Sequence, residues 1–143
     1  FPFGEGDYVS LHYEATPHPI RALQAVRARG GKAMLALNPA TPVGVLESCL
    51  DDLDGVLLMT VNPGYAGQKL IPRTLDKIAE TRAFLDARGF TNIEIEVDGN
   101  VSFENALKMR EKGADIFVAG SSSIFHKGGS LADNTEKLRQ AIR

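Results

Sequence analysis

The sequence predicts an α/β fold built on a parallel sheet, and two observations carry this prediction. Apolar runs of strand length alternate with amphipathic patterns of helical period, and several of the apolar runs end in small or acidic residues. Strict strand–helix alternation is typical of parallel sheets with right-handed crossovers. The predicted strands cover residues 7–14, 32–38, 55–61, 93–99 and 116–121.

A helical pattern follows each predicted strand, at residues 18–30, 42–53, 71–89, 102–113 and 131–143. Thr41 is the expected N-cap of the second helix, with Pro42 as its first residue, and Ser102 is the expected cap of the fourth. Glycines stand where helix C-termini favour a left-handed residue, namely Gly30, Gly89 and Gly113. The apolar positions expected to face the core are Ile20, Leu23, Val26, Val43, Leu46, Leu50, Leu53, Leu75, Ile78, Leu85, Phe103, Ala106, Leu107, Leu131, Leu138 and Ile142.

The predicted strand at residues 93–99 indicates which kind of parallel sheet this is. Ile93, Ile95 and Val97 face one way, while acidic residues at 94, 96 and 98 face the other. Open sheets covered by helices on both faces are apolar on both faces, whereas acidic residues on one side fit the inside of a barrel near its mouth. Five strand–helix units are too few to close an eight-stranded barrel. The chain is therefore either an open five-stranded sheet or a piece of a barrel.

Composition narrows the functional classes. With 143 residues, 43% hydrophobic and 24% charged, the chain fits one globular domain, and its net charge of −2 favours neither nucleic acid nor an anionic membrane as partner. No apolar run reaches the roughly 20 residues of a membrane span, and the first residues do not resemble a signal peptide. The single cysteine, Cys49, lies in a helical pattern and is expected in the core. We expect a reducing, cytoplasmic location.

Three predicted strand ends carry residues suited to chemistry. Asp98 ends its strand before Gly99, at the edge where parallel folds place their sites, and a carboxylate there either binds a metal, moves a proton or caps a loop. The segment Gly64-Tyr65-Ala66-Gly67 forms either an ordinary turn or a nest of backbone N–H groups for an anion. Gly120-Ser121 follows the last strand. Side by side, the three ends would make a phosphate pocket with a carboxylate beside it.

The remaining candidate residues are expected to have structural roles or to lie in solvent. His12 and Glu14 project from the same side of the first strand, and His12 is expected to be a hydrogen-bonded core residue. His18 and His126 are expected in solvent, and the three histidines lack metal-ligand spacing. Core packing is the default expectation for Met34 and Met59, and Glu96 is expected to support Asp98.

The motifs together resemble the ribulose-phosphate 3-epimerase family. They are MTVNPGYAGQ at residues 59–68, IEVDG at 95–99 and GADIFVAGS at 113–121, with LHYEA at 11–15 and LNPATP at 37–42 fitting the preceding strands. This family is a (β/α)8 TIM barrel. The resemblance implies that residues 1–143 form a single partial barrel domain covering about strands four to eight.

The resemblance implies metal-dependent inversion of carbon 3 in a phosphorylated ketose, converting D-ribulose 5-phosphate into D-xylulose 5-phosphate through an enediolate with two acid/base carboxylates. Asp98 would be one of these carboxylates and a ligand of a divalent ion, whether zinc, iron, manganese or cobalt. The implied substrate-binding residues are Met59, Gly64, Tyr65, Ala66, Gly67, Gly99, Asn100, Gly120 and Ser121. A homo-oligomer is also implied.

Departures from the family pattern leave the function open in three ways. The units carrying the second aspartate and the metal-binding histidines have no counterpart here, so we expect the chain alone to be inactive. Ala66 and Asn100 stand where pentose enzymes have glycine, as in the branch acting on D-allulose 6-phosphate. Ribulose 5-phosphate remains the preferred substrate. The sequence is also compatible with a non-catalytic phosphate-binding half-barrel and with a different phosphate-binding barrel isomerase.

Overall fold

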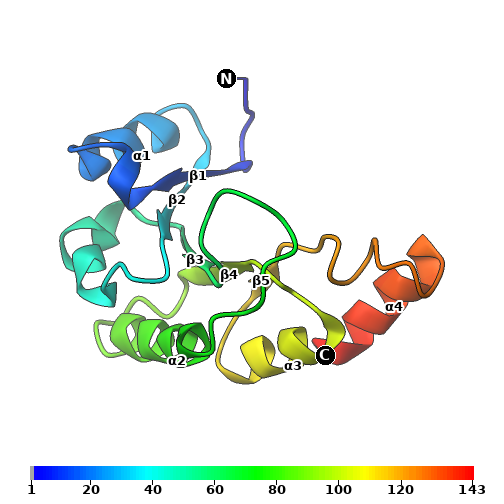
Figure 1. Cartoon of the computed structure of the whole chain (residues 1–143). Helices are drawn as coiled ribbons and strands as arrows, with labels where there is room; N and C mark the ends of the chain where they lie inside the picture. Colours follow the sequence, from blue (N-terminus) through cyan, green and yellow to red (C-terminus); the bar gives the residue numbers. More distant parts are fainter. Residues whose placement is uncertain (1) are drawn as a thin grey trace.

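The computed structural model describes residues 2–143 and contains one parallel sheet (Figure 1). Five strands lie in the order β1-β2-β3-β4-β5, which is also their order in the chain. Their bounds are β1 Tyr8–His12, β2 Lys32–Leu37, β3 Gly55–Met59, β4 Glu94–Asp98 and β5 Ile116–Phe117. The predicted parallel α/β fold is confirmed, although all five strands are shorter than expected, β5 most of all.

The helices follow one another around the outside of the sheet, as the arc in Figure 1 shows. Their bounds are η1 Tyr13–Ala15, α1 Pro19–Arg27, η2 Val43–Asp52, α2 Arg73–Asp86, α3 Phe103–Glu111 and α4 Leu131–Ala141. Within residues 2–143 no helix has the length and apolar character needed to cross a bilayer.

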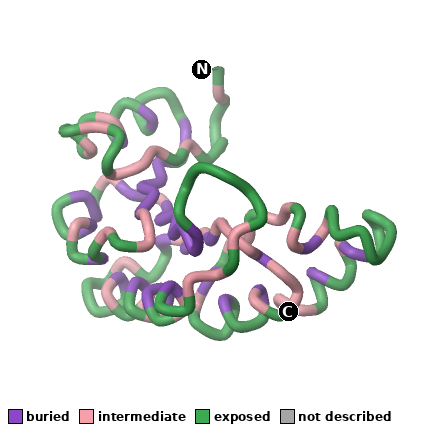
Figure 2. The backbone as a smooth tube through the Cα atoms, in the orientation of Figure 1, coloured by how far each residue is buried: buried purple, intermediate pink, exposed green. Residues whose placement is uncertain are grey.

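The two faces of the sheet bury different residues. The main core lies between the sheet and the helices, and includes Leu35, Val56 and Ile95. Figure 2 shows this buried layer along the strands and the inner sides of the helices. A separate small cluster on the opposite face contains Ala36, Leu57 and Met59. The acidic residues of β4 lie on this second face, since Glu96 pairs with Leu57 and Asp98 with Met59.

The sheet is strongly curved, as expected for part of a barrel. The Tyr8 hydroxyl on β1 donates a hydrogen bond to the Glu94 carboxylate on β4, although β2 and β3 lie between them. Neighbouring strands are about 4.8 Å apart, so a flat sheet would place β1 and β4 beyond the reach of these side chains. Gly55 on β3 makes room for the Met34 side chain of β2, since a Cβ atom at Gly55 would lie 2.6 Å from Met34 Cε. The partial barrel is therefore the correct alternative, and the open flat sheet is excluded.

The helix expected at residues 42–53 is a 3-10 helix, and its predicted cap is wrong. Pro42 is the N-cap, with an extended ψ of 145°, and no side chain caps the helix. The Thr41 hydroxyl instead donates to the Glu14 carboxylate. Because this partner lies on a preceding unit of the chain, the local pattern at residues 41–42 carried no sign of it.

Helix ends were predicted better than helix faces. The Ser102 hydroxyl accepts a hydrogen bond from the Asn105 N–H, as expected of a cap. The three expected left-handed glycines, Gly30, Gly89 and Gly113, all have positive φ. In contrast, three apolar residues expected to face the core are exposed, namely Ile20, Leu107 and Leu131. In α3 the buried side is set by Ala106 and Met109, and Leu107 lies about 100° around the helix from Ala106.

A buried lysine fixes the loop that follows β2. Lys77 on α2 is 7% exposed, and its ammonium group donates to the carbonyls of Asn38 (2.7 Å), Pro39 (3.3 Å) and Thr41 (2.6 Å). Burial lowers the pKa of Lys77, and the negative charges of Glu14 and Glu80 partly oppose this shift. One side chain therefore satisfies three loop carbonyls at the carboxyl edge of the sheet.

Replacing Lys77 with methionine is expected to destabilise the chain by about 3 kcal/mol, because three carbonyls lose a charged donor in a buried site. Urea unfolding measures this loss. Lys127→Met is the control, since Lys127 is exposed. Equal unfolding midpoints for the two variants would show that the loop does not depend on the lysine.

Candidate functional site

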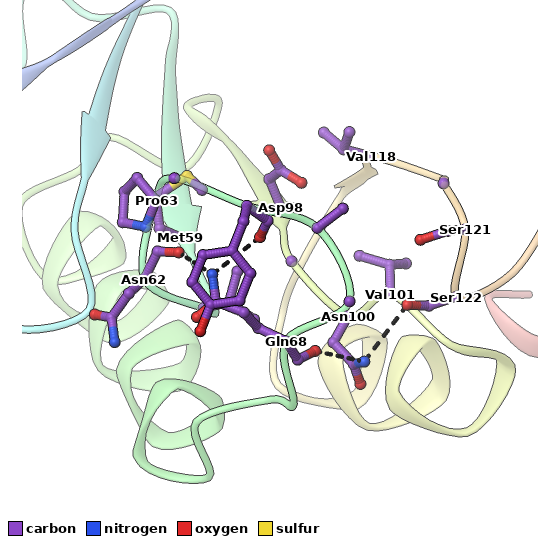
Figure 3. Close-up of a pocket in the computed structure, with 17 residues that line it drawn as sticks. Met59, Asn62, Pro63, Gln68, Asp98, Asn100, Val101, Val118, Ser121 and Ser122 are labelled. Atoms are coloured by element: carbon purple, nitrogen blue, oxygen red, sulfur yellow. Dashed lines mark hydrogen bonds between the residues drawn. The ribbon is translucent and has the colours of Figure 1, made fainter.

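The carboxyl ends of β3, β4 and β5 surround one pocket of about 330 Å³ (Figure 3). The loops after these three strands supply most of its wall. All ten residues singled out in the sequence line it, namely Met59, Gly64, Tyr65, Ala66, Gly67, Asp98, Gly99, Asn100, Gly120 and Ser121. Residues from three separate strand ends are therefore brought together as expected, and their chemical roles remain predictions.

The loop after β3 forms one side of the pocket and is exposed along residues 62–67 (Figures 1 and 2). Gly64 and Gly67 have φ of 135° and 83°, values that strongly favour glycine. The Gln68 side chain braces the loop from within, since its amide donates to the carbonyls of Asn62 (2.5 Å) and Tyr65 (3.0 Å). Within residues 2–143 no hydrogen bond uses the N–H groups of residues 64–67.

The turn after β4 passes very close to the end of β3. The buried hydroxyl of Thr60 donates to the carbonyls of both Asp98 and Gly99. Gly99 has φ of 122°, and a Cβ atom there would lie 2.6 Å from Val61 Cγ2 and 2.9 Å from Val61 N. The turn therefore requires glycine for its conformation and for its packing.

The backbone N–H groups of the other two loops are also available. No hydrogen bond within the described chain uses the N–H groups of Gly99, Asn100, Gly120 or Ser121. Together with residues 64–67, these groups give the pocket donors from three loops. Such convergent backbone donors are suited to an anion with several oxygens, such as a phosphate.

Asp98 lines the pocket from the carboxyl end of β4. It is the last residue of β4, pairs in register with Met59, and is half-buried. No hydrogen bond from residues 2–143 reaches its carboxylate, and the cap of α3 is Ser102. Asp98 therefore does not cap a helix or brace a loop. Burial raises the pKa of the Asp98 carboxyl, so this group is a stronger base than an ordinary aspartate.

Glu96 lies deeper on the same face of the sheet. Burial raises the pKa of Glu96, and the charge of Asp98 raises it further. The folded chain therefore binds these two protons more tightly than the unfolded chain does. Where the native state binds more protons, stability falls as pH rises, from the unfolded pKa of about 4.3 through the folded one.

Glu96→Gln is accordingly expected to raise stability at pH 8, where the wild-type glutamate is ionised, and to gain little near pH 4. Urea unfolding at the two pH values measures the difference. Glu111→Gln, at an exposed position, is the control and should behave like the wild type at both. If Glu96→Gln is no more stable than the wild type at pH 8, burial of the ionised Glu96 carboxylate does not destabilise the fold.

The histidines take no part in this pocket. His12 is not a core residue as predicted, because its side chain is 37% exposed and lies 3.8 Å from Glu14. His18 and His126 are exposed, as expected. In the described part of the chain no group of three or more His, Cys, Asp or Glu side chains could hold a metal ion. Cys49 and Met34 are buried in the core, as predicted.

Sequence reasoning missed the polar residues that join the loops. Gln68 stood in the recognised motif without an assigned role, while Thr60, Asn105 and Ser122 were not singled out. Asn105 is recognisable in sequence only as a polar residue three positions after a helix cap. Thr60 and Ser122 bond to the turn after β4, which is distant in sequence. Gln68 bonds within its own loop, and Asn105 bonds to Asn100 just before α3. These contacts depend on loop conformation, so they are visible only in three dimensions.

The fold is similar to that of a much larger solved protein. A mutant flavocytochrome b2 with pyruvate bound matches 86% of this chain and 31% of its own, with a TM-score of 0.54 and 18% sequence identity. This likeness concerns the fold alone.

Curated relatives are much closer in sequence. Ribulose-phosphate 3-epimerase of Bacillus subtilis is 50% identical over 116 residues, which cover 81% of this chain and 54% of the relative. The enzyme of the same name from Escherichia coli K12 is 48% identical over 114 residues, covering 80% of this chain and 50% of the relative. This chain thus spans about half the length of the relatives it matches. A sequence profile of the ribulose-phosphate 3-epimerase family matches residues 3–125. The chain belongs to the ribulose-phosphate 3-epimerase family.

Proposed function

We propose that this chain supplies the phosphate-binding loops and one acid/base carboxylate of an enzyme that inverts carbon 3 of a phosphorylated ketose, with D-ribulose 5-phosphate and D-xylulose 5-phosphate as the substrate pair. The single observation that carries this proposal is the shared pocket. The Asp98 carboxylate, which accepts no hydrogen bond from the described chain, lines it together with free backbone N–H groups from three loops.

The loops would hold the phosphate end of the substrate. A phosphate dianion accepts several hydrogen bonds, and the N–H groups of residues 64–67, 99–100 and 120–121 are uncommitted. Binding energy from this remote group would fix the sugar relative to Asp98. These loops would contact the phosphate and not the rest of the sugar. They would therefore accept a five-carbon or a six-carbon ketose phosphate.

Asp98 would move the proton. The proton on carbon 3 is acidified by the neighbouring ketone, and its removal leaves an enediolate. The raised pKa of Asp98 brings this carboxylate closer to the acidity needed for both accepting and returning a proton. Inversion also needs a second acid on the opposite side of carbon 3. Glu96 shares the strand and the face of Asp98, so it does not fill this role. The second acid would come from outside residues 2–143.

A divalent metal does not fit the described residues by themselves. Catalytic zinc sites use three protein ligands, and here Asp98 is the one His, Cys, Asp or Glu side chain among the described residues that line the pocket. Asp98 would serve as one ligand in an assembly whose other ligands lie elsewhere. The metal requirement is thus a property of that assembly.

Two competing functions rest on specific residues. Ala66 and Asn100 favour D-allulose 6-phosphate, because they stand where pentose enzymes have glycine. The lack of a second carboxylate on the opposite side of the described pocket favours a non-catalytic phosphate-binding half-barrel.

Reconstitution separates these possibilities. The chain is co-expressed with the part of the Bacillus subtilis enzyme that lies outside the 116 matched residues. Each ketose phosphate is then incubated in D₂O, with and without chelator, and deuterium at carbon 3 is followed by proton NMR. Incorporation into ribulose 5-phosphate by the pair, and by neither part alone, is expected. Faster incorporation into allulose 6-phosphate would reassign the substrate, and a stable, phosphate-binding pair that incorporates no deuterium would favour the non-catalytic half-barrel.

A further inference from the structure

Asn100 connects the three loops of the pocket, and we propose that it is a positioning residue that holds them in one arrangement for an incoming phosphate. This inference rests on the proposed phosphate site. It assigns to the Asn100 side chain a role distinct from that of its backbone, which faces the pocket as part of the turn after β4.

The Asn100 side chain uses both of its donors and its acceptor within the protein, and Figure 3 shows the two bonds that it donates. Its amide nitrogen donates to the Gln68 carbonyl at 2.9 Å, on the loop after β3, and to Ser122 Oγ at 3.4 Å, on the loop after β5. Its amide oxygen accepts from the Asn105 side chain at 2.7 Å, on α3. With both N–H donors occupied, the side chain has none left for a phosphate oxygen.

Asn105 in turn fixes the Asn100 backbone. The Asn105 amide donates to the Asn100 carbonyl at 3.0 Å as well as to the side-chain oxygen. Both asparagines are only partly exposed. The backbone and side chain of Asn100 are therefore both held by the first turn of α3, and Ser102 caps this helix.

The backbone conformation of Asn100 indicates that its side chain has a structural role. Asn100 has φ of 48°, and it is the one described residue other than glycine with positive φ. Glycine adopts this conformation without strain, whereas asparagine does so at a small cost. Conformation alone would thus favour glycine, and the cross-loop hydrogen bonds offset the cost of asparagine.

The consequence for binding is preorganisation. The loop after β3 is exposed over six residues and otherwise braces mainly itself through Gln68. Tying it to the other two loops lowers the entropy lost when all three close on one anion. Removal of the Asn100 side-chain hydrogen bonds should weaken phosphate binding, although these bonds are not themselves contacts to the phosphate.

The test compares Asn100→Gly and Asn105→Ala with the wild-type chain, using inorganic phosphate as the probe. Calorimetry measures the dissociation constant, and amide hydrogen exchange reports on residues 64–68 and 120–122. We expect phosphate to bind about five- to tenfold more weakly to Asn100→Gly, with faster exchange in both loops and unchanged exchange in β2 and β3. Asn105→Ala should shift both readouts in the same direction. It leaves the residue at position 100 intact, so the added freedom of a glycine does not explain its effect.

Asn92→Gly, at an exposed turn, is the matched control and should leave both readouts unchanged. Wild-type phosphate affinity in both test variants would overturn the positioning role, whatever the exchange rates. If the wild-type chain binds no phosphate, the proposed phosphate site fails instead. In that case, faster amide hydrogen exchange in the loops after β3 and β5 of both variants would still show that Asn100 holds these loops together.

Discussion

Asp98→Asn is expected to reduce deuterium incorporation at carbon 3 by at least about 10³-fold in the reconstituted pair, the order of loss for removing a general base. The asparagine keeps the size of the side chain but cannot accept the proton. The Asp98 carboxylate has no hydrogen-bond partner in the described chain, so the substitution breaks no side-chain contact that the fold uses.

The same variant should bind inorganic phosphate at least as tightly as the wild type, because a negative charge in the pocket is removed. Separate measurement of turnover and of phosphate binding therefore distinguishes a catalytic role from misfolding. Asp133→Asn, on α4 and away from the pocket, is the control. Turnover at the wild-type rate in Asp98→Asn would remove this residue from the chemistry.

Gly99→Ala is expected to destabilise the chain by about 3 kcal/mol or more. The substitution adds the strain of a non-glycine residue at φ of 122° to the clash of its Cβ with Val61, 2.6 Å from Cγ2 and 2.9 Å from the backbone nitrogen. The backbone nitrogen cannot rotate away as the end of a flexible side chain can. Urea unfolding measures the loss.

Alanine substitutions at two other glycines of the same pocket distinguish backbone strain from the steric clash of the added Cβ. A Cβ at Gly67 meets nothing within 4 Å but the residue has φ of 83°, so Gly67→Ala should cost about 1 kcal/mol through strain alone. A Cβ at Gly120 also meets nothing within 4 Å, and its φ lies outside the strained range, so Gly120→Ala should be nearly neutral. The order Gly99, Gly67, Gly120 is the expected result. A Gly99→Ala variant as stable as Gly120→Ala would show that the turn relaxes freely.

Local sequence patterns determine much of this fold. The alternation in β4 depends only on the two-residue period of a strand, and it correctly placed Ile95 and Val97 in the core with Glu96 and Asp98 opposite. The site was predictable for the same reason, since parallel strands bring their carboxyl ends to one edge regardless of sequence details. The alternation left an open sheet and a piece of a barrel as alternatives, and the resemblance to the epimerase family, confirmed by the curated relatives, favoured the barrel.

Contacts between distant segments were not predictable. Thr41 matches the pattern of a helix cap, but its hydroxyl is taken by Glu14, 27 positions away. Lys77 is a polar residue within an amphipathic helix, and only the folded chain places three carbonyls around its ammonium group. The Asn100 side chain likewise has its partners on two other loops and on α3. Helical periodicity also misplaced Leu107, because it does not fix where the apolar side of a short helix ends.

Titration of the wild-type chain with inorganic phosphate, followed by amide chemical shifts, tests the central claim most directly. The account predicts that amides of residues 64–67, 99–100 and 120–121 shift together with one dissociation constant, while amides of α1 do not respond. Shifts confined to one loop, or spread over exposed lysines and arginines without saturation, would contradict a single phosphate site built from three strand ends.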